Sequence, residues 1–140
     1  MIALDTDHLS ILDHDSIEGF VLGSRLAARA NEDAFVTIIT YEEQMRDWLS
    51  YVAKATSAAQ QTRAYEKLRQ HVDTFRRIPL LDYDASAAHT FERLRQQRIR
   101  IGSMDLKIAA IAITNGALLL SRNLRDFQQV PGLQVEDWTA

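Results

Sequence analysis

Short apolar runs, none long enough for a core helix, alternate with segments of helical character along this 140-residue chain. The runs cover residues 2–4, 35–39, 78–81, 117–120 and, less regularly, 133–138. Runs of this length that end in polar or turn residues indicate strands. When strands alternate with helices, each helix returns the chain to the same end of the sheet, so the strands pair in parallel. We therefore expect an α/β fold with a mostly parallel central sheet flanked by helices.

The segments between the runs predict the helices. A short helix should follow the potential caps at residues 5–7, and others are expected over residues 23–31, 85–97 after Asp84, and 104–115 after Ser103. Thr40 and Glu43 fit the capping-box pattern, so a further helix is expected to begin at Thr40. Its pattern continues to residue 75 with a break near residues 55–58, which predicts a helical hairpin that forms an arm.

Composition limits the kinds of site that the chain can carry. Its length predicts a single domain over residues 1–140, because a chain of this size buries about two-thirds of its unfolded surface. With no cysteine and only four histidines, a metal site must rely mainly on oxygen, which suits Mg²⁺ or Mn²⁺. The formal net charge of -3 argues against a general polyanion binder. The chain runs from Met1 directly into its first strand without a basic or long apolar leader, so a cytoplasmic protein is expected.

Acidic residues stand where the apolar runs end. Asp5 follows the first run, Glu43 lies one turn beyond the second, and Asp105 opens an apolar helix. Asn123 and Asp126 lie just past the run at 117–120. Because the carboxyl ends of parallel strands meet at one edge of a sheet, these side chains should converge. Gathered carboxylates either hold a divalent cation or repel one another and take up protons, and the metal site is the more economical interpretation.

Each acid also has a purely structural interpretation. Glu43 could complete the capping box, a role worth about 1 kcal/mol, and Asp105 could complement the positive end of its helix, worth about 0.3 to 1 kcal/mol. Asp5 is different, because an acid that ends a buried strand needs a partner or a cation. Asp7 and Asp126 suit caps or loops, whereas neutral Asn123 can offer one carbonyl oxygen or hold a water.

Several segments together carry a family resemblance. They are residues 4–7 (LDTD), 37–43 (TIITYEE), 101–110 (IGSMDLKIAA), 120–127 (LSRNLRDF), 130–133 (VPGL) and 136–138 (EDW). In this order, and over essentially the whole chain, they resemble the PIN-domain family, and within it the VapC toxins of bacterial toxin–antitoxin pairs.

The resemblance implies a function and a set of site residues. It implies an Mg²⁺- or Mn²⁺-dependent endoribonuclease that acts on single-stranded or looped RNA and leaves a 5'-phosphate. The family's three invariant acids match Asp5, Glu43 and Asp105, which would bind metal, and Asn123 occupies the variable fourth acidic position of the catalytic set. Asp126 is a possible helper, as is Asp7, which replaces the usual Asn of the opening motif. A homodimer and a VapB-like antitoxin that covers the site are also expected.

Two other functions remain open on sequence alone. A degenerate PIN-like domain that binds RNA or a partner without cutting is compatible with the neutral Asn123. An aspartyl phosphatase is suggested by the resemblance of Asp5-Thr6-Asp7 to the nucleophile loop of haloacid-dehalogenase-type enzymes. Leu9 stands where that loop would carry a threonine, which disfavours the phosphatase.

Overall fold

A parallel five-stranded sheet forms the centre of the computed structural model, which describes all residues from 1 to 140. Its spatial order is β3-β2-β1-β4-β5, so the first strand lies in the middle, between β2 and β4. The bounds are β1 (Ile2–Leu4), β2 (Ala34–Thr37), β3 (Leu80–Leu81), β4 (Leu118–Leu120) and β5 (Val135–Glu136). The α/β prediction with a parallel sheet is confirmed.

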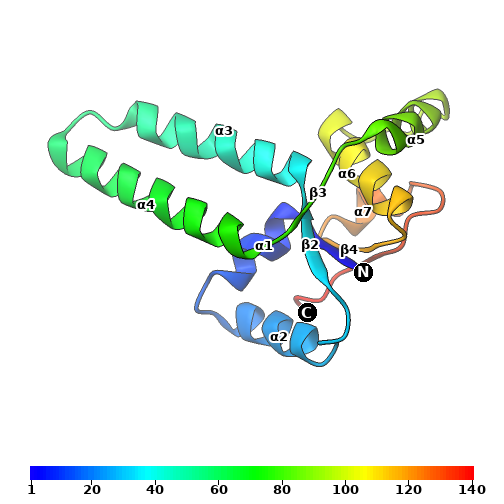
Figure 1. Ribbon diagram of the computed structural model, residues 1–140, viewed down its shortest axis with the longest axis horizontal. Coiled ribbons are helices and arrows are strands. Elements are labelled where there is room, and N and C mark those ends of the chain that lie inside the picture. The colour runs from blue at the N-terminus through cyan, green and yellow to red at the C-terminus, as the bar shows by residue number, and fades with distance from the viewer.

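Seven helices connect and cover the strands: α1 (Thr6–Leu12), α2 (Ile17–Ala27), α3 (Ile38–Lys54), α4 (Ala58–Arg77), α5 (Ala85–Gln96), α6 (Ser103–Thr114) and α7 (Leu124–Phe127). Helices α3 and α4 lie side by side and project away from the sheet as the expected arm (Figure 1). The turn between them is stabilised by a capping box of Ser57 and Gln60. No helix has both the length and the apolar character needed to span a bilayer.

Side chains alternate between the two faces of the central strands and build two separate cores. On one face Ala3 and Leu119 pack against helices α5 and α6, and the middle of α6 is buried all round, as its apolar sequence predicts. On the other face Ile2 and Leu4 pack with Leu22 of α2. Both faces of β1 are thus apolar, which is typical of a central parallel strand. The polar positions of this region are displaced to the ends of the strands.

The second strand ends earlier than the apolar run suggested, and the predicted capping box at Thr40 and Glu43 is wrong. Helix α3 begins at Ile38, and its cap is Thr37, whose Oγ1 accepts a hydrogen bond from the Thr40 backbone N–H at 3.1 Å. The apolar residues 38 and 39 therefore belong to the first turn of a helix and not to the strand. Glu43 is the sixth residue of α3, beyond the first turn, so its carboxylate is not used by the cap.

Two other helix starts also differ from the prediction. Helix α2 begins at Ile17 instead of residue 23, because the Ser16 side chain caps it by accepting from the Gly19 N–H at 3.0 Å. Gly19 allows close packing instead of breaking the helix: a Cβ there would lie 2.5 Å from the His14 carbonyl oxygen. Helix α6 is capped at Gly102 and not at Ser103. The Asp84 cap of α5 is as predicted.

Candidate functional site

The acidic residues lie at the carboxyl edge of the sheet, two of them where neighbouring strands end and one in the first turn of a helix. Asp5 follows β1 directly, and Glu43 is carried by α3, which begins where β2 ends. Asp105 is the third residue of α6. Their charges act on one another, since Asp5 and Asp105 both raise the pKa of Glu43. The predicted convergence is therefore present in the fold.

Asp5 is the most enclosed of the acids, at 7 % exposure. Its Oδ1 caps α1 by accepting from the Thr6 N–H at 2.8 Å, and its Oδ2 accepts from the Ser121 hydroxyl at 2.8 Å. Burial raises the pKa of Asp5 to about 6, the hydrogen bonds from Ser121 and Thr6 oppose that shift, and the charges of Asp7 and Asp105 add to it. The side chain is thus held in place by neutral donors, and no Lys, Arg or His side chain forms an ion pair with it.

Glu43 and Asp105 are half-buried and share the same electrostatic strain. For Glu43, burial is the largest cause of a raised pKa, followed by the charges of Asp5 and Asp105. Its side chain makes one long hydrogen bond of 3.4 Å, in which Thr6 Oγ1 donates to Oε2. For Asp105, burial again raises the pKa most, followed by the charges of Asp126 and Asp7. None of the ion pairs in the structure involves any of these three acids.

The expected helpers lie beside this cluster and are tied into it by hydrogen bonds. Asp126 Oδ2 accepts from the side-chain amide of Asn123 at 3.1 Å, and Asn123 stands at the start of α7. The Asp7 carboxylate uses both oxygens: Oδ1 lies 2.7 Å from His8 Nδ1, and Oδ2 accepts from the Arg122 N–H at 3.0 Å. Asp7 and Asp126 therefore raise the pKa of Asp105 through charge, while Asp7 holds the backbone at Arg122 and Asp126 holds the side chain of Asn123.

Ser121 is a direct partner of Asp5 that the sequence interpretation missed. It is fully buried, donates to Asp5, and accepts from the Asn123 N–H at 3.0 Å. In the sheet Leu4 pairs with Leu120, so the residues that follow these partners, Asp5 and Ser121, come to lie side by side. The signal that could have found it is its position one residue past an apolar run, which is the position Asp5 has after the first run.

The donor set suits a hard divalent cation. Three carboxylates with raised pKa values and no cationic partner would each gain from a bound Mg²⁺ or Mn²⁺ ion, and both ions prefer oxygen ligands. As the side chains are placed, no three His, Asp or Glu groups are close enough to enclose an ion. An Mg²⁺ site needs only one or two carboxylates, with waters and phosphate oxygens as the other ligands. The residues present therefore fit an open metal site that substrate would complete.

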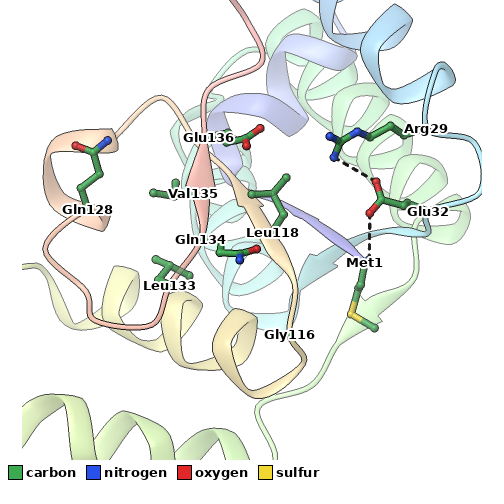
Figure 2. A pocket seen from close by; sticks show the side chains of 10 residues that line it. All are labelled: Met1, Arg29, Glu32, Gly116, Leu118, Gln128, Leu133, Gln134, Val135 and Glu136. Carbon is green, nitrogen blue, oxygen red and sulfur yellow. Dashed lines mark hydrogen bonds and ion pairs between the residues drawn. The ribbon is translucent and has the colours of Figure 1, made fainter.

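A cavity of about 660 Å³ lies at the opposite edge of the sheet (Figure 2). Its lining includes Met1 and Gln134, which precede β1 and β5, so it marks the amino ends of the strands. Glu32 in this cavity has cationic partners: its carboxylate contacts Arg29 Nη1 at 3.3 Å and the terminal amine of Met1 at 3.8 Å. Volume alone would point here, but the unbalanced carboxylates are at the other edge.

Known proteins similar to this chain are named as VapC ribonucleases or VapBC complexes. The chain is 36% identical over 66 residues to the tRNA(fMet)-specific endonuclease VapC of Salmonella typhimurium, an overlap that covers 44% of this chain and 50% of that protein. The chain thus spans about half the length of this relative and of the VapC of Shigella flexneri. No protein-family model matches it.

The similarity to solved structures extends over the whole fold. VapBC-1 from nontypeable Haemophilus influenzae covers 100% of both chains with a TM-score of 0.67 and 25% identity. VapBC2 from Rickettsia felis, solved with a fragment of promoter DNA, covers 99% of both chains with a TM-score of 0.72 and 23% identity. The chain is therefore similar in sequence to VapC ribonucleases and in fold to the structures named VapBC.

Proposed function

We propose that this protein is a divalent-metal-dependent endoribonuclease, the toxin of a toxin–antitoxin pair, which hydrolyses phosphodiester bonds in single-stranded or looped RNA. The observation that supports the proposal is that Asp5, Glu43 and Asp105 lie at the carboxyl edge of the sheet, act on one another's charge, and form no ion pair with a Lys, Arg or His side chain. The VapC names of its relatives support ribonuclease chemistry at this edge.

Asp5, Glu43 and Asp105 would hold Mg²⁺ or Mn²⁺ at this site. Such an ion, when bound, supplies a more acidic water near neutral pH and stabilises the charge that develops on the phosphate. Ser121 and Thr6 donate hydrogen bonds to Asp5 that favour its charged form, which is the form that binds a cation.

The neutral side chain of Asn123 completes the polar edge. Its amide nitrogen is engaged by Asp126, so its carbonyl oxygen is the group left to hold a water or a substrate hydroxyl. Glu43 is held by a single hydrogen bond of 3.4 Å from Thr6, so its carboxylate is less restrained than that of Asp5 and can turn toward an ion. RNA would then approach over an edge where cation and phosphate meet.

An RNA cleavage assay with Mg²⁺, Mn²⁺ or EDTA tests this proposal. We expect cleavage with either metal, none with EDTA, and almost none with Asp5→Asn, with 5'-phosphate ends on the sequenced products. Asp33→Asn is the matched control, because Asp33 is exposed and lies just before β2, at the opposite edge. Cleavage that survives both EDTA and Asp5→Asn would refute the proposal.

The neutral residue at position 123 favours one alternative, a domain that keeps the fold and binds without cutting. Titration calorimetry separates the two functions, because a nuclease of this kind should bind Mn²⁺ and Asp5→Asn should weaken that binding. Absence of heat with both Mg²⁺ and Mn²⁺ would favour the non-catalytic domain.

We also propose that the chain forms a homodimer and binds a VapB-like antitoxin. The proposal is supported by solved relatives that are described as VapBC complexes, two of them with DNA. Expression of the chain alone should arrest growth, and co-expression with a short reading frame beside its gene should relieve the arrest and yield a co-purifying complex. Light scattering on the purified chain measures the dimer directly. Unimpaired growth with abundant wild-type protein would contradict the toxin assignment.

A further inference from the structure

His8 is fully buried on α1 and has a defined partner at each ring nitrogen. Its Nε2 lies 3.1 Å from the backbone nitrogen of Trp138, which can only donate, so Nε2 must be the unprotonated acceptor. The ring proton of the neutral imidazole is then on Nδ1, which lies 2.7 Å from Asp7 Oδ1 and donates to it. Packing around His8 therefore selects one tautomer.

The carboxyl group of Asp137 does not compete for this ring. Its Oδ1 is 3.6 Å from His8 Nε2, which is beyond hydrogen-bond range. That oxygen already accepts from the backbone N–H and the hydroxyl of Thr139, at 2.8 and 2.6 Å. A proton on Nε2 would also face the Trp138 N–H, so donor would meet donor.

Asp7 connects His8 to the loop after β4 through hydrogen bonds. While Oδ1 accepts from His8, Oδ2 accepts from the Arg122 N–H at 3.0 Å. Arg122 stands between Ser121, which donates to Asp5, and Asn123, whose N–H donates to Ser121. An unbroken path of hydrogen bonds and adjacent residues therefore runs from the backbone of Trp138 to the most buried acid of the site.

We infer that His8 is a positioning residue: through Nδ1 it fixes the Asp7 carboxylate, and Asp7 holds the segment 121–123 against Asp5. The inference rests on the proposed function, because the geometry being fixed is that of the metal-binding acids. Groups that orient metal ligands commonly change metal affinity or activity by about 10- to 100-fold when removed. The plainer explanation is a core histidine that merely satisfies its surroundings, in which case either lost hydrogen bond would cost stability alone.

Two substitutions separate these explanations, because each keeps one end of the imidazole. His8→Asn can keep a donor near the position of Nδ1 but does not reach Trp138, whereas His8→Gln can keep an acceptor near Nε2 but loses the donor to Asp7. We expect RNA cleavage by His8→Gln to fall at least about tenfold in kcat with KM nearly unchanged. His8→Asn should stay within about threefold of the wild type, even though both variants lose stability.

A second readout needs neither metal nor RNA. In metal-free protein, hydrogen exchange of the Arg122 amide should accelerate about tenfold or more in His8→Gln, while His8→Asn keeps its protection. Equal effects of the two variants on kcat and on this amide would overturn the inference, as would an unchanged Arg122 amide in His8→Gln.

The wild-type protein gives a test that does not depend on whether either variant folds. The ¹⁵N shifts of the His8 ring in metal-free protein should show the proton on Nδ1, and a proton on Nε2 would refute the inference. These readouts also separate the two proposals. If the wild type cleaves no RNA, the proposed function fails, while amide exchange and the ring tautomer still decide the role of His8.

Discussion

The two edges of the central sheet differ in whether their acidic side chains form ion pairs. At the amino edge, a cavity of about 660 Å³ contains Glu32 in contact with Arg29 and with the terminal amine of Met1. At the carboxyl edge, Asp5 and Glu43 are partnered by hydroxyl and backbone N–H groups, and neither forms an ion pair with a Lys, Arg or His side chain.

The difference shows that unbalanced charge locates the site better than hollow volume does. Opposite charges that pair at a surface contribute little and need no ligand. Carboxylates that raise one another's pKa cost stability in the folded state, and a bound divalent cation would remove that cost. Carboxyl groups whose pKa values are shifted in this way are typical of active sites.

The largest effect should come from neutralising an acid at the carboxyl edge. Asp105→Asn is expected to lower RNA cleavage about a thousandfold, the upper range for removing one charge-stabilising group from an active site. Single-turnover cleavage with saturating Mn²⁺ measures it. Asp82→Asn is the control, since Asp82 is exposed just past the edge strand β3, and it should cleave normally. Equal rates for the two variants would show that Asp105 contributes no more to cleavage than an exposed acid beside the edge strand.

The pH dependence of stability should expose the cost of the buried charge on Asp5. Its pKa is raised from 3.8 to about 6, so the folded protein keeps a proton between these pH values that the unfolded chain releases. This group's contribution to the free energy of unfolding therefore falls as pH rises through that window and stays low above it. Asp5→Asn lacks this loss, so its stability relative to the wild type should rise by about 2 kcal/mol between pH 4 and 7.5.

Urea unfolding in EDTA at the two pH values measures that change. Added Mg²⁺ or Mn²⁺ should stabilise the wild type at pH 7.5 and have much less effect on Asp5→Asn. A difference in stability between the two proteins that does not vary with pH would show that the Asp5 charge is not costly in the fold.

Removing a neutral partner of the acids should have an intermediate effect. Ser121→Ala deletes the hydroxyl that donates to Asp5, so cleavage should fall about 10- to 100-fold. Thr90→Val is the matched control: it removes one of the two hydrogen-bond partners of the Thr114 hydroxyl, the one between α5 and α6, and should lower stability without changing cleavage. A normal rate for Ser121→Ala would mean that Asp5 needs no orienting donor.

The smallest effect is expected at the amino edge. Glu32→Gln removes the charge that Arg29 and Met1 contact, and exposed pairs of this kind contribute about 0 to 1 kcal/mol. Thermal unfolding should move little, and RNA cleavage should stay at the wild-type rate. A marked loss of cleavage would show that the two edges are coupled.

The positions of the strands along the chain were predictable because apolar runs report burial directly. Their ends were less so: Ile38 and Ile39 look like strand residues, but the hydroxyl of Thr37 starts a helix there. Apolar residues do not distinguish the end of a buried strand from the start of a buried helix. Part of the site was predictable in the same way, because parallel topology alone places Asp5 and Glu43 at the same edge of the sheet.

The supporting contacts were beyond the sequence because they depend on which strands are neighbours. Ser121 meets Asp5 across 116 positions of the chain, and His8 meets Trp138 across 130. Many hydroxyl and imidazole groups in the chain look equally suitable when considered alone. Only the pairing of β1 with β4 and the return of the C-terminal segment select these partners.

Gly19 shows that a position with no side chain can be intolerant of substitution. A Cβ there would lie 2.5 and 2.7 Å from the carbonyl oxygens of His14 and Ile11, and backbone at that point cannot yield as a side chain would. In a genetic selection for cells that survive expression of this chain, we therefore expect changes at Gly19 to be recovered beside changes at the acids. Such a selection would report the architecture and the chemistry together, and only purified protein would tell the two apart.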